Sequence, residues 1–239
     1  MPFYIAISII ALGLIPSLSW LGLYLKKDLH PEPPHLIIQT FILGMISAPF
    51  VVVFQLLFSF MHGGLTAGVV SDSPSFFLWA AFVEEFFKFL IVWLFVVRTQ
   101  EFDEPTDAII YMIVAGLGFA AMENILFLFK TSPEGIDSTL RVWALRFMGA
   151  TFLHALTAAI TGYFIAIAWF FRHHTFKLIS IGLTLATLVH FTFNLLILRA
   201  DIDKLAMVYA FILLIIISIF VSILFQKILQ RQKQESLST

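Results

Sequence analysis

The chain has 239 residues, of which 60% are hydrophobic and only 12% are charged, and its mean hydropathy is +0.98. A soluble domain with one core cannot hide this much apolar surface, so the composition predicts an integral membrane protein whose surroundings are the lipid bilayer. The formal net charge of -1 and the lack of basic runs give no reason to expect nucleic acid as a partner. The absence of cysteine excludes disulfides, thiolate metal sites and a cysteine nucleophile.

Apolar segments of about 20 residues recur between short polar breaks, and each could cross roughly 30 Å of hydrocarbon as a helix. They predict an all-α, polytopic membrane protein with about seven transmembrane helices in one bundle. One transmembrane domain over residues 1–226 and a polar cytoplasmic tail over 227–239 are expected. The predicted spans lie near residues 3–25, 37–60, 75–97, 107–129, 147–170, 177–198 and 205–226.

The distribution of lysine and arginine predicts the orientation, because cytoplasmic loops carry an excess of these residues. The face bordered by the first, third and fifth loops and the C-terminal tail holds eight of them: Lys26, Lys27, Arg98, Arg172, Lys177, Lys227, Arg231 and Lys233. The opposite face holds five: Lys130, Arg141, Arg146, Arg199 and Lys204. We therefore expect a multi-pass protein of the cell membrane with its N-terminus outside and its C-terminus in the cytoplasm.

The stretch FVEEFFKF places Glu84, Glu85 and Lys88 near the middle of the predicted span 75–97. Together with Glu123 in the next span, these charges would cost on the order of 10 kcal/mol if they were unpaired in the bilayer. On a helix Lys88 lies within reach of either glutamate, so an ion pair is expected. One interpretation is structural: the ion pair and a further buried carboxylate would fix the register of the helices. The other is functional, because ionisable residues within a membrane more often mark a functional site.

Further polar residues lie within three other spans. Asn124 follows Glu123 after a face of small residues, His154 lies early in the span 147–170, and His190 and Asn194 share a helix face in the span 177–198. Because successive spans alternate in direction, all of these residues and the two glutamates fall in the same half of the membrane. This agreement in depth predicts one buried polar site.

Carboxylates, histidines and an amide suit the activation of water. A glutamate can act as general base, and a histidine and an asparagine can donate hydrogen bonds to the oxyanion of an attacked carbonyl. Glutamate and histidine are also metal ligands, so a zinc or dimetal site is the alternative. The chain has neither HExxH nor a helical ExxH pair, and the neighbouring lysine would repel a cation.

Four motifs in order resemble the PrsW-type intramembrane proteases: EExxK at Glu84 to Lys88, GLGFAAMEN ending at Asn124, HALTAAITGY and HxxxN. HPEP in the first loop is similar as well, and the resemblance covers residues 28–195 or so. The wider superfamily includes CAAX prenyl proteases and bacteriocin-processing proteins, with motifs EExxxR, FxxxH and HxxxN. This chain has Lys88 one residue closer than their arginine, and Glu123 where their second motif has histidine.

The resemblance implies a glutamic-type, metal-independent intramembrane endopeptidase without a cofactor. It also implies a membrane-anchored protein substrate, such as an anti-sigma factor, cut on its extracytoplasmic side. The site residues that we assign are Glu84, Glu85, Glu123, His154, His190 and Asn194 as catalytic, with Lys88 and Asn124 orienting them. Of the two adjacent glutamates, Glu85 is favoured as the base.

Two other functions remain open from the sequence. A proton- or cation-coupled transporter also needs embedded glutamate, lysine and histidine, although no duplicated half with paired broken helices is present. A non-catalytic membrane scaffold or immunity protein of the same fold would keep the same motifs.

Overall fold

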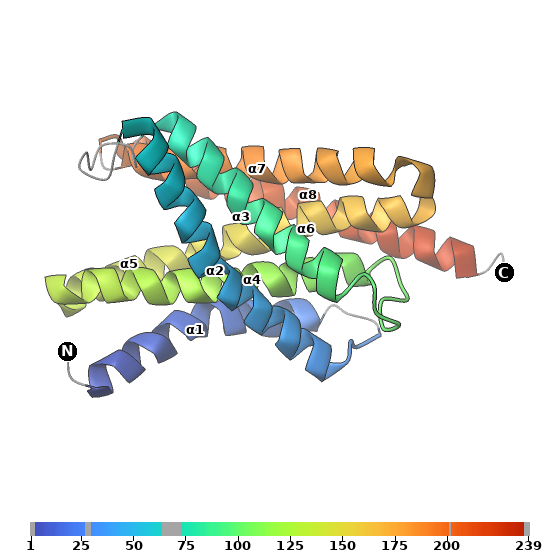
Figure 1. Cartoon of the computed structure of the whole chain (residues 1–239), viewed down its shortest axis with the longest axis horizontal. Helices are drawn as coiled ribbons and strands as arrows, with labels where there is room; N and C mark the ends of the chain where they lie inside the picture. Colours follow the sequence, from blue (N-terminus) through green and yellow to red (C-terminus); the bar gives the residue numbers. More distant parts are fainter. Residues whose placement is uncertain (1–2, 27–29, 64–72, 201, 237–239) are drawn as a thin grey trace.

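The computed structural model describes residues 3–26, 30–63, 73–200 and 202–236, and these form helices without any strand (Figure 1). The α-helices are α1 Phe3–Leu25, α2 Pro34–Gly63, α3 Pro74–Phe95, α4 Asp107–Thr131, α5 Ile136–Met148, α6 Ala150–Phe170, α7 Thr175–Ala200 and α8 Lys204–Ser236. Short 3₁₀ turns, η2 Ser132–Glu134 and η3 Arg172–His174, follow α4 and α6. Most of the predicted second loop, residues 64–72, lies outside the described residues.

Length and apolarity confirm an all-α polytopic membrane protein. Six helical stretches in the described part of the chain are long and apolar enough to cross a bilayer. Helix α3 is not among them, although its 22 residues match a predicted span, because Glu84, Glu85 and Lys88 interrupt its apolar run. Large apolar side chains such as Phe50, Ile215 and Ile219 are exposed on the outer helices, where the bilayer replaces a protein core.

Helix α4 is the centre of the bundle. It packs against α6, α2, α1 and α3, and α2 crosses it obliquely (Figure 1). Every residue from Asp107 to Ala121 is buried. Close approach depends on glycine: a Cβ atom on Gly118 would lie 2.1 Å from the carbonyl oxygen of Phe41, and one on Gly44 would lie 2.3 Å from that of Ala115. Backbones of α2 and α4 therefore touch directly, as small residues allow in membranes.

Two segments differ from the predicted elements. The polar break between the spans 107–129 and 147–170 contains α5, a helix of 13 residues that is too short to be recognised as a span. The last helix, α8, does not end at residue 226 but continues through Lys227 to Ser236, a segment without glycine or proline to stop it. The location of this segment in the cytoplasm remains a prediction.

The helix directions decide where the polar residues meet. The end of α4, the start of α3, the start of α6 and the end of α7 share one end of the bundle (Figure 1). Glu123 lies eight residues from the end of α4 at Thr131 and sixteen from its start at Asp107, or about 12 Å and 24 Å along the helix. The site therefore lies nearer to this end, as the predicted depths require.

The glycine contact gives a test of the fold. Gly118→Ala forces a methyl group against the backbone of Phe41, so it should destabilise the protein by about 1–3 kcal/mol. Gly22→Ala is the matched control, since nothing lies within 4 Å of a Cβ at that helical position. Thermal unfolding of the purified protein in detergent measures both variants. Equal midpoints for the two would contradict direct backbone packing between α2 and α4.

Candidate active site

Four helices bring the predicted residues together. Helix α3 supplies Glu84, Glu85 and Lys88, α4 supplies Glu123 and Asn124, α6 supplies His154, and α7 supplies His190 and Asn194. All of them except Glu123 and Asn194 are buried. The residues that were predicted to share one depth in the membrane therefore do lie together. The chemical role of each of them stays a prediction.

Glu85 is the most fully engaged group of the site. Its Oε1 accepts hydrogen bonds from Lys88 Nζ at 2.6 Å, Thr157 Oγ1 at 2.9 Å and His190 Nδ1 at 2.7 Å. The side chains of Glu85 and Lys88 are both fully buried. One carboxylate oxygen thus connects α3, α6 and α7, and it neutralises the lysine that the sequence placed in the middle of a span.

Glu84 faces a different environment although it is the adjacent residue. Its Oε1 accepts a hydrogen bond from Gln55 Nε2 at 2.9 Å, and it lines a cavity of about 550 Å³. Its Oε2 has no hydrogen-bond partner among the described residues, and it lies 3.5 Å from His190 Nε2. Glu85 also has an unbonded Oε2, but Glu85 does not line the cavity. Glu85 is held by structural partners, whereas Glu84 lines the cavity, so the geometry favours Glu84 over Glu85, which the sequence analysis prefers as the base. Which of the two acts as the base stays a prediction.

The contacts of His190 indicate which of its nitrogens carries the proton. A carboxylate only accepts hydrogen bonds, so His190 Nδ1 donates to Glu85. In the neutral ring, Nε2 then carries a lone pair that faces Glu84. Glu85 orients His190 in the way that a second carboxylate orients a catalytic or metal-binding histidine.

Both nitrogens of His154 are already engaged. Its Nδ1 lies 3.1 Å from Lys88 Nζ, and its Nε2 lies 2.9 Å from Glu123 Oε2. A lysine ammonium only donates, so Nδ1 accepts and Nε2 donates to the carboxylate. The ring also meets His190 edge to face, with centroids 5.1 Å apart. His154 therefore links the Lys88–Glu85 pair to Glu123.

Glu123 has a second partner that sequence reasoning missed. Arg146 of α5 donates to Glu123 Oε2 from Nη2 at 2.6 Å and to Asn124 Oδ1 from Nε at 2.7 Å. Asn124 in turn donates to Thr151 Oγ1 at 2.9 Å. The orienting role expected of Asn124 therefore acts on Arg146 rather than on the glutamates of α3. In the sequence analysis Arg146 counts among the basic residues of one membrane face, because α5 gives no span signal.

Gln55 and Thr157 are the other two residues that the sequence analysis did not identify. Gln55 carried a usable signal, as a long polar side chain inside the apolar stretch of α2. Thr157 carried a weaker one, since it follows His154 by one helical turn but is a common residue in membrane helices.

Residues of six helices, α2 to α7, line the cavity, and its wall has two chemical parts. Polar groups of Glu84, Glu123, His154, His190 and Asn194 line one part. Phenylalanines line much of the rest, namely Phe76, Phe77, Phe127 and Phe193. A mostly apolar cavity with a few convergent polar groups is typical of a ligand-binding or active site.

One cluster in the described residues could hold a metal ion. Glu84, His154 and His190 each offer one ligand atom, and these atoms lie within 4.8 Å of one another. The lone pair of His190 Nε2 and the unbonded Oε2 of Glu84 suit such a ligand set. His154 suits it poorly, because its acceptor nitrogen faces an ammonium and its donor nitrogen faces a carboxylate.

Residues 32–225 match the family model described as PrsW family intramembrane metalloprotease. Three bacterial proteins named Protease PrsW are similar to the chain. The one from Geobacillus kaustophilus is 33% identical over 68% of this chain and 68% of its own length. The one from Oceanobacillus iheyensis is 31% identical over 79% of this chain and 82% of its own length. The one from Bacillus subtilis is 29% identical over 78% of this chain and 81% of its own length. No solved structure matches the chain.

The Lys88–Glu85 pair gives a test of the buried network. Lys88→Met leaves a fully buried carboxylate without its cation, so the variant should lose about 3–5 kcal/mol of stability. The double variant Glu85→Gln, Lys88→Met removes both charges and should recover most of that loss. Thermal or denaturant unfolding in detergent measures both. A double variant as unstable as Lys88→Met would contradict a mutually neutralising pair.

Proposed function

This chain belongs to the PrsW family of intramembrane proteases, and we propose that it hydrolyses a peptide bond of a membrane-anchored protein with water activated by Glu84. The observation that carries the proposal is the position of Glu84, which lines the cavity and whose buried Oε2 has no hydrogen-bond partner among the described residues and lies 3.5 Å from Nε2 of His190. Two acceptors that face each other across this distance need a shared proton or a water molecule between them.

A water molecule held by Glu84 and His190 would be ready for attack. As its oxygen bonds to the scissile carbonyl carbon, Glu84 takes one of its protons as general base. The carbonyl oxygen becomes an oxyanion, and the side-chain amide of Asn194, one turn along α7 from His190 and on the same cavity wall, donates a hydrogen bond to it. Glu84 then returns the proton to the leaving nitrogen as the C–N bond breaks, so that the products are a carboxylic acid, which ionises by releasing its proton to water, and an amine.

The remaining polar residues position this machinery. Glu85 fixes the ring of His190, and Lys88 neutralises Glu85. Glu123 is neutralised by Arg146 and fixes His154, which accepts from Lys88. This assigns Glu85 and Glu123 to positioning rather than to proton transfer.

We further propose that the reaction needs no metal ion, although the family description implies one. Within the cluster of Glu84, His154 and His190, the ring of His154 is committed to Lys88 and Glu123, which leaves two ligand atoms available, and catalytic zinc sites use three protein ligands. The charges are also balanced already: Lys88 and Arg146 pair with two of the three carboxylates, and Lys130 lines the same cavity as the third. A divalent cation bound to His154 would also be repelled by the ammonium of Lys88, which lies 3.1 Å from Nδ1 of that histidine.

The substrate that we propose is a single-pass membrane protein, such as an anti-sigma factor. A helical substrate shields its carbonyls, so it must unwind before water can reach them. The phenylalanines of the cavity wall offer apolar surface for an unwound membrane segment, while the polar wall faces the bond to be cut. A non-catalytic scaffold of the same fold would have the same cavity and would fail the cleavage assay below.

We propose that the cavity end of the bundle faces the outside of the cell membrane. Arg146 is engaged by Glu123 within the site, so only four of the five basic residues on that face remain, against eight at the other end. Reporter fusions after His62 and at the C-terminus should show an external second loop and a cytoplasmic C-terminus. The reverse pattern would show that the topology is inverted.

A cleavage assay with a panel of single-pass membrane proteins tests the mechanism. Glu84→Gln keeps the size of the side chain and removes the base, so it should abolish cleavage. Glu104→Gln, at the other end of the bundle, is the matched control and should retain activity. Asn194→Ala should lower turnover by about 10²–10³-fold with little change in substrate binding. Full activity of Glu84→Gln would refute the assignment of the base.

The metal question needs a separate measurement. If glutamate alone activates water, exhaustive chelation should leave cleavage intact, and elemental analysis of the purified protein should detect no stoichiometric zinc or other transition metal. Loss of activity on chelation, with recovery on adding back one metal, would support the ligand set Glu84, His154 and His190 instead.

A further inference from the structure

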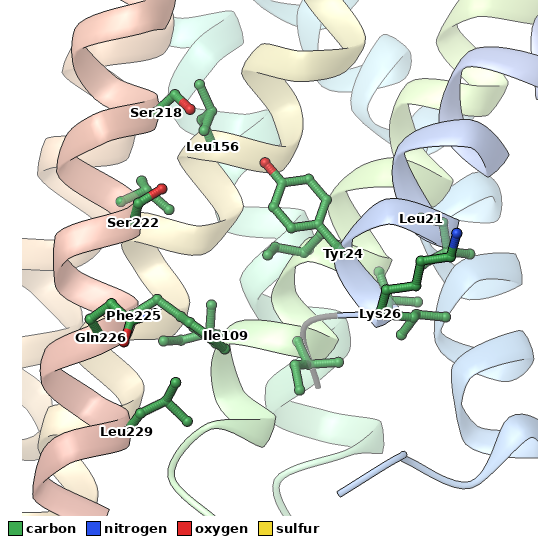
Figure 2. Close-up of a pocket in the computed structure, with 15 residues that line it drawn as sticks. Leu21, Tyr24, Lys26, Ile109, Leu156, Ser218, Ser222, Phe225, Gln226 and Leu229 are labelled. Carbon is green, nitrogen blue, oxygen red and sulfur yellow. The ribbon is translucent and has the colours of Figure 1, made fainter. Parts of the chain in front are cut away.

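A second cavity, unrelated to the site above, lies between α1 and α8 towards the opposite end of the bundle. It measures about 570 Å³, and its lining includes Leu21, Ile109, Ile113, Leu156 and Phe225 (Figure 2). It exists because α1 packs chiefly on α4, whereas α8 packs on α6 and α7, so that the two outer helices leave a slot over α4 and α6. We call this cavity the α1–α8 slot.

The length of the α1–α8 slot corresponds to one leaflet of a bilayer. Its lining on α8 extends from Ser218 to Leu229, which is about 17 Å along a helix. Half of a hydrocarbon core is about 15 Å. The slot also begins at Lys26, beside the last turn of α1, and therefore at the level where the helices leave the bilayer.

The walls of the slot are mostly apolar, with a few polar groups on α1 and α8. Leucine, isoleucine and valine side chains line most of it, and the hydroxyl groups of Ser218 and Ser222 project from α8 into the gap (Figure 2). The ring of Tyr24 reaches across from α1, with its hydroxyl on the side of Leu156 and Ser218. An apolar slot of this size would not hold stable water, and an empty one would lose the dispersion contacts of its lining.

Lys26 supplies the charge at the open end. Its side chain is exposed, and among the described residues it forms no salt bridge. Gln226 lies on the opposite wall of the slot, on α8, and offers an amide donor (Figure 2). A cation and an amide next to an apolar slot that opens at the membrane surface match a phosphate group attached to an acyl chain.

We propose that the α1–α8 slot binds one anionic phospholipid, with an acyl chain over α4 and α6 and its phosphate at Lys26. The lipid would fill the gap between α1 and α8, whose apolar spans are only 22% buried, and so stabilise them against the helices that carry Glu123 and His154. This proposal is independent of the proteolytic mechanism, because none of its residues lines the first cavity.

Native mass spectrometry of the delipidated full-length protein in detergent tests the proposal. Phosphatidylglycerol and phosphatidylcholine with identical acyl chains are the probes. The first bound phosphatidylglycerol should be about fivefold tighter than phosphatidylcholine, as one lysine near an anionic lipid predicts. Lys26→Gln should remove this preference. Lys177→Gln, which removes an exposed lysine from the same end of the bundle, should retain it.

A second pair of variants tests the slot without changing charge. Ser222→Trp fills the slot and should weaken the first bound lipid of either type, whereas Ile223→Trp, at an exposed neighbouring position outside the slot, should not. Equal affinity for the two lipids in the native protein would overturn the proposal, as would an unchanged preference in Lys26→Gln. Should Ser222→Trp fail to fold, the Lys26→Gln comparison decides alone.

Discussion

The carboxylate of Glu85 is the constraint on which the rest of the structure depends. An ionised carboxylate buried without partners costs several kcal/mol even after the protein relaxes, so its donors must stay within hydrogen-bond distance. Those donors come from α3, α6 and α7. Satisfying one oxygen atom therefore fixes three helices relative to one another, and it aligns His190 beside the cavity as a consequence.

The division between Glu84 and Glu85 follows from helix geometry. Neighbouring residues on a helix point about 100° apart, so one carboxylate can be enclosed by protein while the other faces a cavity. The enclosed group, Glu85, neutralises Lys88, and the other, Glu84, lines the cavity. A buried ion pair that only fixed helix register would not require the second glutamate, its contact with Gln55 or the facing histidine. The arrangement therefore favours a functional reading of the pair over a purely structural one.

Composition and span length were enough to predict an all-α polytopic membrane protein, because lipid imposes the same length on every spanning helix. Alternation of the spans was enough to predict that residues from four helices meet. The preference between Glu84 and Glu85 was not predictable, since it depends on the angle at which α3 meets α6 and α7. Helix α5 was missed because its 13 residues give no span signal, and with it the contact of Arg146 with Glu123 was missed.

The small residues of α4 connect packing to the chemistry of the site. A Cβ atom on Gly116 would lie 2.8 Å from the carbonyl oxygen of His154 and 2.9 Å from the Cβ atom of Ala158. A larger residue would push α6 away from α4 just where His154 bonds to Lys88 and Glu123. Displacements of about 1 Å can lower catalysis by two orders of magnitude. Gly116 therefore affects more than the stability of the bundle. It fixes the distance between α4 and α6, and so the distance at which His154 reaches Lys88 on α3 and Glu123 on α4.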